Sequence, residues 1–312
     1  MNNFESRLCK VIGICNGNFS LYKDFERIYT FTTENVSDYQ KFFDYRNKSM
    51  FTVGSSIDQV LNAYYCGARD ITLYDINENS KEYGWLKIAS ILSLNYDEFQ
   101  QFFFKKSFWD SDYQDMFSKE TFNKVKSTLR LLDYESFLFF DELFSLYDGS
   151  LIRDRLFDDD ESRIPVIKGF NFYLRDEESY NTLKSSLKRI SFNFVNGDIF
   201  QDEIKGIFDN IFLSNLCTTV DVDKLKSLLV KLKDNNLSAD GSILVGYLWD
   251  MDFDNNDYKD DWSEIYKMPI VREKLVDFIT EHKKIRDSRD IIWNEDEKRD
   301  MVLIYRNGVS NQ

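Results

Sequence analysis

A short apolar strand that runs into a tight Gly-Ser turn is the feature of this sequence that most limits its fold. Residues 50–54 predict the strand, Gly54-Ser55-Ser56 predicts the turn, and residues 57–66 predict a helix with its apolar positions on one face. Residues 71–74 predict a second strand, which Asp75 ends 21 positions after Gly54. Nucleotide-binding βαβ units place a carboxylate on a ribose about 20 residues after their turn. The pattern therefore predicts a βαβ unit and a nucleoside ligand.

The alternation of strands and helices returns in the second half of the chain. Helical spacing of apolar residues predicts helices at residues 80–94, 180–189, 222–235 and 272–282, and apolar runs predict strands at residues 192–195, 210–213 and 243–247. Asp240-Gly241 predicts a turn before the last of these strands, and residues 290–293 and 300–306 have hairpin character. Strands joined by helices of crossover length predict an α/β fold with a doubly wound, mostly parallel, Rossmann-like sheet and a C-terminal antiparallel hairpin.

These patterns divide the chain into four parts. Residues 1–48 form an N-terminal helical segment, residues 49–95 the first half of the Rossmann-like domain, and residues 166–312 its second half. Residues 96–165 interrupt the alternation with Phe- and Leu-rich helices at residues 99–104, 122–132 and 137–147. This helical insertion is either additional core or a lid or cap that binds the acceptor substrate.

Charge and composition exclude several classes of protein. The 312 residues carry a formal net charge of −14, which repels phosphate backbones and anionic lipid headgroups. The best basic cluster, residues 184–189, is short and typical of a solvated helix face, so we expect no nucleic-acid partner. No apolar run approaches the roughly 20 residues that span a bilayer, so we expect no integral membrane segment. The four cysteines lack Cys-x-x-Cys spacing and favour a cytoplasmic protein, whose oligomeric state stays open.

The turn Gly54-Ser55-Ser56 predicts which kind of nucleoside is bound. Glycine lets the backbone approach a ligand closely, and the following helix offers free N–H groups. A dinucleotide requires Gly-x-Gly-x-x-Gly, of which only the first glycine is present, so an NAD-linked enzyme is the weaker alternative. S-adenosylmethionine has no pyrophosphate and tolerates the serines. Asp58 either receives the amino group of its methionine part or stabilises the helix N-terminus.

Acidic residues after two further strands extend the candidate site. Asp75, followed by Ile76 and Asn77, either accepts hydrogen bonds from both ribose hydroxyls or caps a turn, and its position and spacing favour the ribose. Asp198, followed by Ile199, either accepts from the adenine amino group or belongs to a generic Asn-Gly-Asp turn.

The ends of the fourth and fifth predicted strands supply the remaining candidates. Ser214 and Asn215 lie where a doubly wound sheet opens its ligand crevice, and Asn215 would bind the cofactor or steer the acceptor. Tyr247 ends the fifth strand, and its ring and that of Tyr39 could attract a sulfonium by cation–π interaction.

Other chemistries are disfavoured. The single histidine, His282, falls on a predicted helix and is typical of a surface or core residue, and neither a Gly-x-Ser-x-Gly elbow nor a phosphate-binding P-loop is present. Residues 252–256 resemble the start of a calcium loop, but Asp257 replaces its glycine and Ser263 its final glutamate. We therefore expect an acidic loop at residues 249–262 and no metal site.

The order of these pieces resembles the class I S-adenosylmethionine-dependent methyltransferase fold. A narrower resemblance covers residues 30–105 and is to the family of diacylglycerol 3-amino-3-carboxypropyl transferases of betaine-lipid synthesis and their bacterial relatives. Ile57 stands where that family usually has a glycine. The residues that carry the resemblance are Thr32–Asn35, Thr52–Asn62, Gly67-Ala68, Asp75–Asn77, Leu86–Ala89, Tyr96–Phe99 and Phe102-Phe103.

The resemblance implies binding of S-adenosylmethionine and transfer of its methyl or its 3-amino-3-carboxypropyl group to a small-molecule or lipid-like acceptor, with Asn35 and Tyr39 on the acceptor side. Both transfers are in-line displacements in which alignment supplies most of the rate, and neither requires a metal or a histidine. A non-catalytic S-adenosylmethionine-binding or scaffold protein is the alternative, because the turn has lost glycines and no general base is evident.

Overall fold

The computed structural model describes residues 3–22, 25–54, 56–104, 116–158, 164–249, 273–286 and 298–308. The chain forms two compact units whose segments alternate along the sequence. The helical unit comprises Met1–Thr32, Ser55–Leu61 and Asp75–Ile190, and it contains the whole of the expected insertion at residues 96–165. The sheet unit comprises Thr33–Gly54, Asn62–Tyr74 and Ser191–Gln312.

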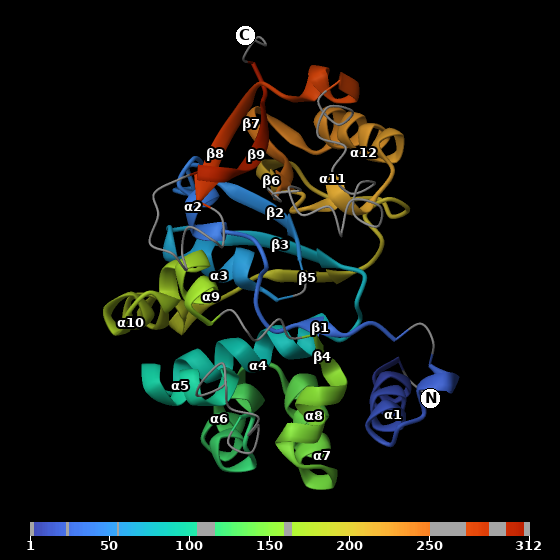
Figure 1. The fold of residues 1–312 in the computed structure, drawn as a ribbon, viewed down its shortest axis with the longest axis vertical. Coiled ribbons are helices and arrows are strands. Elements are labelled where there is room, and N and C mark those ends of the chain that lie inside the picture. The colour runs from blue at the N-terminus through green and yellow to red at the C-terminus, as the bar shows by residue number, and fades with distance from the viewer. Residues whose placement is uncertain are drawn as a thin grey trace, which may run out of the picture. The chain divides into compact units, whose positions relative to one another are not determined.

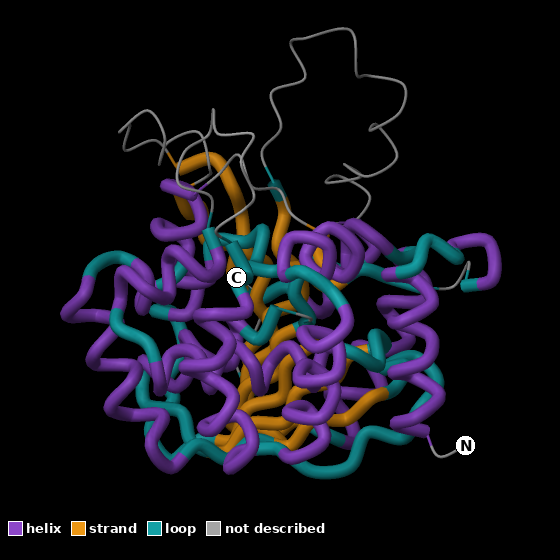
Figure 2. Tube along the Cα trace, turned by 90° about the horizontal axis from the view of Figure 1, so that it is seen from below, coloured by secondary structure: helices purple, strands orange, loops and turns teal. Residues whose placement is uncertain are grey.

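A seven-stranded sheet with the order β5-β3-β2-β6-β7-β9-β8 dominates the sheet unit (Figure 1). Strand β2 pairs in parallel with β3 and β6, β6 pairs in parallel with β7, and β9 is antiparallel to both β7 and β8. The strands of this sheet, orange in Figure 2, lie side by side and twist from one strand to the next. The strands are β2 (Ser49–Val53), β3 (Asp70–Asp75), β5 (Asn193–Asn196), β6 (Phe208–Phe212), β7 (Leu237–Leu248), β8 (Glu281–Arg286) and β9 (Lys298–Arg306).

The first five of these strands follow the doubly wound order 3-2-1-4-5 when they are counted along the chain. The antiparallel pair β9 and β8 extends the sheet beyond β7. The predicted fold class, a doubly wound, mostly parallel Rossmann-like sheet with a C-terminal antiparallel pair, is confirmed.

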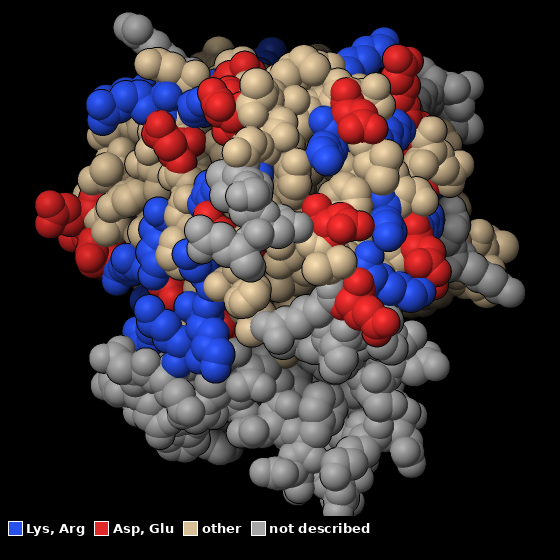
Figure 3. All heavy atoms as spheres, turned by 90° about the horizontal axis from the view of Figure 1, so that it is seen from above, with Lys and Arg blue, Asp and Glu red and all other residues tan. Residues whose placement is uncertain are grey.

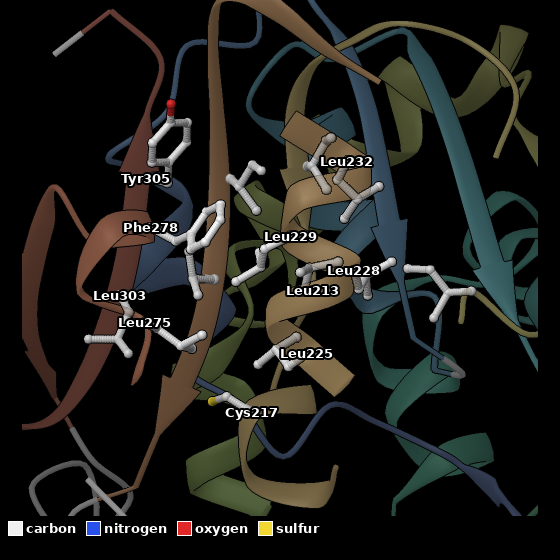
Figure 4. Packing of buried hydrophobic residues seen from close by; sticks show 14 of the residues in the cluster. Leu213, Cys217, Leu225, Leu228, Leu229, Leu232, Leu275, Phe278, Leu303 and Tyr305 are labelled. Atoms are coloured by element: carbon white, nitrogen blue, oxygen red, sulfur yellow. The ribbon is translucent and has the colours of Figure 1, made fainter. Parts of the chain in front are cut away.

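Apolar runs explain why the central strands lie where they do. Strand β7 is buried from Gly241 to Leu248, and β6 buries four of its five residues, as expected for strands covered on both faces. Helix α12 (Val222–Asn235) begins at Asp221, whose side chain accepts from two backbone N–H groups of the first turn. Figure 4 shows the leucines of α12 packed beside strand and loop residues of the same core. The labelled residues are Leu213, Cys217, Leu225, Leu228, Leu229, Leu232, Leu275, Phe278, Leu303 and Tyr305.

Short helices complete the sheet unit. Helix α2 (Val36–Gln40) contacts β8, α11 (Leu216–Thr219) contacts β7, and η6 (Val276–Phe278) precedes β8. Helix α3 (Asp58–Tyr65) contributes residues to both units. It is followed by Gly67, which has a φ of +106° and ends the helix as predicted.

Phenylalanine-rich helices make up most of the helical unit. Asn95 begins α5 with a capping box to Glu98, and Ser118 and Asp133 cap the next two helices with their side chains. Phe117 packs within 5.3 Å, centroid to centroid, of the rings of Phe102 and Phe144. The elements are α1 (Asn3–Cys15), η1 (Phe19–Leu21), β1 (Ile28–Tyr29), α4 (Ser80–Ser93), α5 (Tyr96–Phe103), α6 (Lys119–Leu132), α7 (Tyr134–Leu146), α8 (Gly149–Leu156), β4 (Phe157–Asp158), α9 (Ile164–Phe170), η3 (Phe172–Leu174), α10 (Glu177–Ser186) and η4 (Leu187–Arg189), with β1 and β4 paired in parallel.

The helix predicted at residues 272–282 is wrong in its second half. Residues 281–286 form β8, and His282 pairs with Leu303 of β9. The segment has alternating burial and lies at the edge of the sheet, where lysines and other charged residues are tolerated. The antiparallel partner of β9 is therefore β8, while residues 290–293, which were predicted to pair there, lie outside the described residues.

The turn predicted at Asp240-Gly241 is also wrong, because β7 starts at Leu237 and runs through both residues. The register with β6 advances from Phe208 to Asn210 on one strand and from Leu237 to Ser242 on the other, so the extra residues form an irregularity. A Cβ at Gly241 would lie 2.6 Å from Leu237 Cδ1. The absence of a side chain at Gly241 therefore gives the strand room to bend at this irregularity.

Among the described residues, none of the helices combines the length and the apolar character needed to cross a membrane. On the face drawn in Figure 3, the Lys and Arg side chains lie interspersed with Asp and Glu side chains. The possible calcium loop at residues 252–256 lies outside the described residues.

Candidate functional site

The sheet unit has its topological switch point between β2 and β6. The chain continues from β2 to β3 on one side and from β6 to β7 on the other, and ligands of doubly wound folds bind beyond the carboxyl ends of such strands. Gly54 follows β2 with a φ of +144°, and Ser214 follows β6 with a φ of +55°. Both are backbone conformations that residues with side chains rarely adopt, which is typical of binding turns.

A buried glutamate lies against the turn that follows β6. Glu34 is 2% exposed, and its carboxylate accepts hydrogen bonds from the hydroxyl groups of Ser214 and, at 3.2 Å, of Tyr39. It also accepts from the backbone of Asn215. Burial raises the pKa of Glu34 to about 7, although these hydrogen bonds oppose the rise. The sequence patterns did not predict a role for Glu34, although it lies within Thr32–Asn35, one of the segments that carry the family resemblance.

Asn35 and Tyr247 belong to a neighbouring network in the same unit. The backbone N–H of Asn35 donates to Tyr247 Oη at 3.1 Å, and the Tyr247 hydroxyl donates to Asp300 Oδ2 at 2.6 Å. The Asn35 side chain accepts from the backbone of Asp38 to cap α2, and it donates to the carbonyl oxygen of Arg286. Burial raises the pKa of Tyr247 well above its ordinary value. The hydroxyl therefore stays protonated at neutral pH.

The two tyrosines predicted near the sulfonium lie side by side. Tyr39 and Tyr247 are both fully buried, and their ring centroids lie 6.0 Å apart in an edge-to-face arrangement. Their hydroxyl groups are bonded to Glu34 and Asp300 respectively.

Asp75 is the last residue of β3. Its Oδ1 accepts from the backbone N–H of Asn77 at 2.8 Å, and burial raises its pKa to about 6. The side chain of Asn77 is tied to the carbonyl oxygen of Glu26, while the side chain of Ile76 is 64% exposed. The carboxyl group of Asp75 also has a side-chain hydrogen bond with Ser80. The alternative role of Asp75 as a turn residue is thus present in the structure, and the ribose role stays a proposal.

Asp58 is occupied by contacts within the helical unit. Its Oδ1 lies 2.6 Å from Lys87 Nζ and accepts from the Tyr173 hydroxyl at 2.8 Å, and its Oδ2 accepts from the backbone N–H of Thr32. Ser56 is buried nearby and its hydroxyl accepts from the Asp58 backbone, whereas Ser55 lies outside the described residues. Lys87 and Tyr173 were missed because each looks like an ordinary member of an amphipathic segment.

Asp198 forms a local turn after β5. Its carboxylate accepts from the backbone N–H of Phe200 at 2.9 Å and from the Gln201 side chain at 2.7 Å, and the neighbouring Ile199 is buried in the sheet core. The structure thus shows the turn role of Asp198, and the adenine role stays a proposal.

Comparison with protein-family models finds no match, and neither does comparison with curated proteins. Among solved structures, the chain is similar to PhzM, a pyocyanin biosynthetic protein, with 11% identity over 88% of this chain and 55% of that chain, at a TM-score of 0.38. It is also similar to the N-methyltransferase NodS of Bradyrhizobium japonicum WM9 in complex with S-adenosyl-L-homocysteine. In that case the identity is 8% over 99% of this chain and 90% of that chain, at a TM-score of 0.35. The chain thus spans about half the length of PhzM, and its fold class rests on the strand order and register given above.

Proposed function

We propose that the protein is an S-adenosylmethionine-dependent transferase that acts on a small-molecule or lipid-like acceptor. The observation that carries the proposal is the acid at the end of the second parallel strand. Val53 of β2 pairs with Tyr74 of β3, Gly54 directly follows Val53, and Asp75 directly follows Tyr74. A glycine turn after one strand and an acid after its neighbour are what a nucleoside ribose requires.

The residues present fit an adenosyl group. The positive φ of Gly54 supports a close approach of backbone to ligand, and the carboxylate of Asp75 supplies acceptors for the ribose hydroxyls. Asp198 and Ile199 would face the adenine, and Ser214 and Asn215 would orient the reacting end. Asp58 takes no ligand in this proposal, because Lys87, Tyr173 and Thr32 already occupy its oxygens.

When bound, S-adenosylmethionine supplies an electrophilic carbon next to its sulfonium. The protein's task is alignment, so the acceptor must be held in line with that carbon and water must be excluded. Asn215 is the polar side chain that we propose for orienting the acceptor. Tyr39 and Tyr247 are fully buried, so in this proposal they support the turn after β6 from behind, with their hydroxyls bonded to Glu34 and Asp300.

Calorimetry with S-adenosylhomocysteine tests the ribose assignment. We expect Asp75→Ala to weaken binding by about tenfold to a hundredfold, since hydrogen bonds to a charged group contribute roughly 1.5–3 kcal/mol. Asp70→Asn is the matched control, because Asp70 is the exposed first residue of the same strand. Equal affinity in wild type and Asp75→Ala would overturn the assignment.

Native mass spectrometry of the purified protein identifies the ligand and the transfer. Bound S-adenosylhomocysteine indicates methyl transfer, whereas methylthioadenosine is the product left by aminocarboxypropyl transfer. The NAD-linked alternative would gain support from a different set of results. Neither product would co-purify, S-adenosylhomocysteine would show no binding by calorimetry, and the protein would change the fluorescence of NADH.

A non-catalytic S-adenosylmethionine-binding protein is the second candidate. It is favoured by Ile57, which has a φ of +61° in the turn before α3, where the resembling family usually has a glycine. This candidate predicts binding of S-adenosylmethionine without release of either product when acceptors are supplied. Any acceptor-dependent release of S-adenosylhomocysteine or methylthioadenosine would exclude it.

A further inference from the structure

The segment that precedes α2 and the turn that follows β6 are joined by a single carboxylate. Glu34 belongs to the first of these segments, and it accepts hydrogen bonds from the Ser214 hydroxyl and from the Asn215 backbone in the second. The two segments are separated by about 180 residues in sequence, so only the fold brings them together. The joint lies at the carboxyl end of β6, beside the switch point of the sheet.

The turn that Glu34 holds has an uncommon backbone. Ser214 has a φ of +55°, a left-handed conformation that costs a non-glycine residue energy and persists only when its surroundings impose it. The carbonyl oxygen of Ser214 accepts from the backbone N–H of Tyr247 at 3.2 Å, and the Ser214 hydroxyl donates to Glu34, with Asn215 Oδ1 as a second acceptor at 3.4 Å. Loss of the hydrogen bond between Ser214 and Glu34 would therefore let the strained turn at Ser214 relax.

The surroundings of Glu34 are low in charge. Within the part of the chain that the structure describes, the titratable groups found against it include Tyr39 of α2, Tyr247 of β7 with Asp300 of β9 beyond its hydroxyl, and Cys217 of α11. None of these four is a cation. Burial raises the pKa of Glu34 to about 7, so the group exchanges its proton near neutral pH.

We propose that Glu34 is a positioning residue that holds the Ser214–Asn215 turn in its binding geometry when it is ionised and releases the turn when it is protonated. An ionised carboxylate accepts from both hydroxyls and from the backbone N–H, and such charge-assisted bonds are about twice as strong as neutral ones. Protonation replaces one acceptor site of the carboxylate with a donor and removes its charge, so the three bonds can no longer all be charge-assisted. The consequence for ligands rests on the proposed function: binding of an S-adenosyl compound at this turn is coupled to loss of one proton.

The coupling has a definite sign. Because the ionised form binds the ligand, affinity approaches its full value about one pH unit above the pKa of Glu34 and falls as pH drops through that pKa, by up to about tenfold per pH unit. Asp75 also titrates, with a pKa of about 6, so its effect adds at lower pH. The contribution of Glu34 is the part of the profile that disappears in Glu34→Gln.

Two measurements on the full chain test the proposal. The first is a pH titration of the Asn215 backbone amide by ¹H–¹⁵N NMR without ligand. We expect a midpoint near pH 7 in the wild type, no such midpoint in Glu34→Gln, and an unchanged midpoint in Asp209→Asn. Asp209 is a matched control, because it lies at the other end of β6 and accepts hydrogen bonds from Ser49 and Ser238. A pH-independent Asn215 amide in the wild type would overturn the proposal.

The second measurement is the dissociation constant of S-adenosylhomocysteine between pH 5.5 and 8.5. The wild type should lose about tenfold in affinity between pH 8 and pH 6, and Glu34→Gln should keep only the part due to Asp75. If the ligand fails to bind at every pH, the proposed function is wrong, and the NMR titration alone decides the role of Glu34. If Glu34→Gln does not fold, Ser214→Ala replaces it: it removes one donor to the carboxylate and must move the amide midpoint upward, and an unmoved midpoint contradicts the proposal.

Discussion

Lys87 Nζ lies 2.6 Å from Asp58 Oδ1, and neither side chain is exposed to solvent. The lysine also donates to the carbonyl oxygens of Thr30 and Ser56, at 2.9 and 3.1 Å, and lies 3.9 Å from the centroid of the Phe31 ring. All three ammonium donors thus have an acceptor. Burial lowers the pKa of Lys87 to about 8, while Asp58 opposes the change. This pair fixes α4 to the segment that leads into α3.

Breaking the pair should be costly. Lys87→Met leaves a buried carboxylate without its cation, and we expect a loss of about 3–5 kcal/mol in the free energy of unfolding. The double variant Lys87→Met/Asp58→Asn should lose less than the sum of the single variants, because neither charge is then left alone. Urea denaturation measures all three. Lys81→Met on the same helix removes only partly exposed ion pairs with Asp133 and Glu135 and should cost no more than about 1 kcal/mol. Strict additivity would contradict a coupled pair.

Gly84 of α4 makes room for Ile57. A Cβ at Gly84 would lie 2.9 Å from Ile57 Cδ1, and Ile57 itself is buried with a left-handed φ of +61°. We expect Gly84→Ala to destabilise the wild type by roughly 1–3 kcal/mol, because it overpacks this contact. In an Ile57→Gly background the clash disappears, and the same change should stabilise the protein by about 1 kcal/mol, because alanine favours a helix. Thermal or chemical denaturation of the four proteins decides it, and a cost of the same sign in both backgrounds would refute the packing argument.

Glu34 should make the stability of the protein depend on pH. Its pKa is raised from 4.5 to about 7, so the folded protein binds more protons than the unfolded chain between these values. Stability from this group is therefore fully present below about pH 4.5 and is lost as pH rises to about 7, by about 3 kcal/mol in total. Glu34→Gln should show a smaller fall in the free energy of unfolding over this range. The difference between the two proteins isolates Glu34 from Asp75, and parallel pH profiles would show that Glu34 does not titrate there.

Asn35 should stabilise the folded protein by capping α2 and by its hydrogen bond to the backbone of β8. Asn35→Ala removes the acceptor for the Asp38 backbone and the donor to the carbonyl oxygen of Arg286, and we expect a loss of about 2 kcal/mol. Asn35→Ser restores the cap alone, so its stability should lie between those of the alanine variant and the wild type. Guanidinium titrations provide the comparison. A serine variant no more stable than alanine would show that the cap contributes little.

Strand and helix positions in the parallel part of the sheet followed from local patterns. The runs around Phe51, Leu73, Ile211 and Val245 are buried strands, because an apolar run between turn residues has few other stable arrangements. The pattern failed at His282, because the polar run Glu-His-Lys-Lys at residues 281–284 has none of the apolar alternation that marks a strand. The pairing with β9 decided that segment, and pairing is not a local property.

The sequence alone determined the doubly wound fold class and the strand ends on which Gly54, Asp75 and Ser214 lie, because periodicity and spacing along the chain are local. Only the tertiary structure decided that Glu34 contacts Ser214, that Asp58 is paired with Lys87, and that Tyr39 lies beside Tyr247. Each of these contacts joins segments that are far apart in the sequence, so it forms only when the chain folds. The pKa values of Glu34 and Lys87 depend on the same packing, because burial shifts the pKa of a carboxyl or ammonium group only after the chain has packed around it.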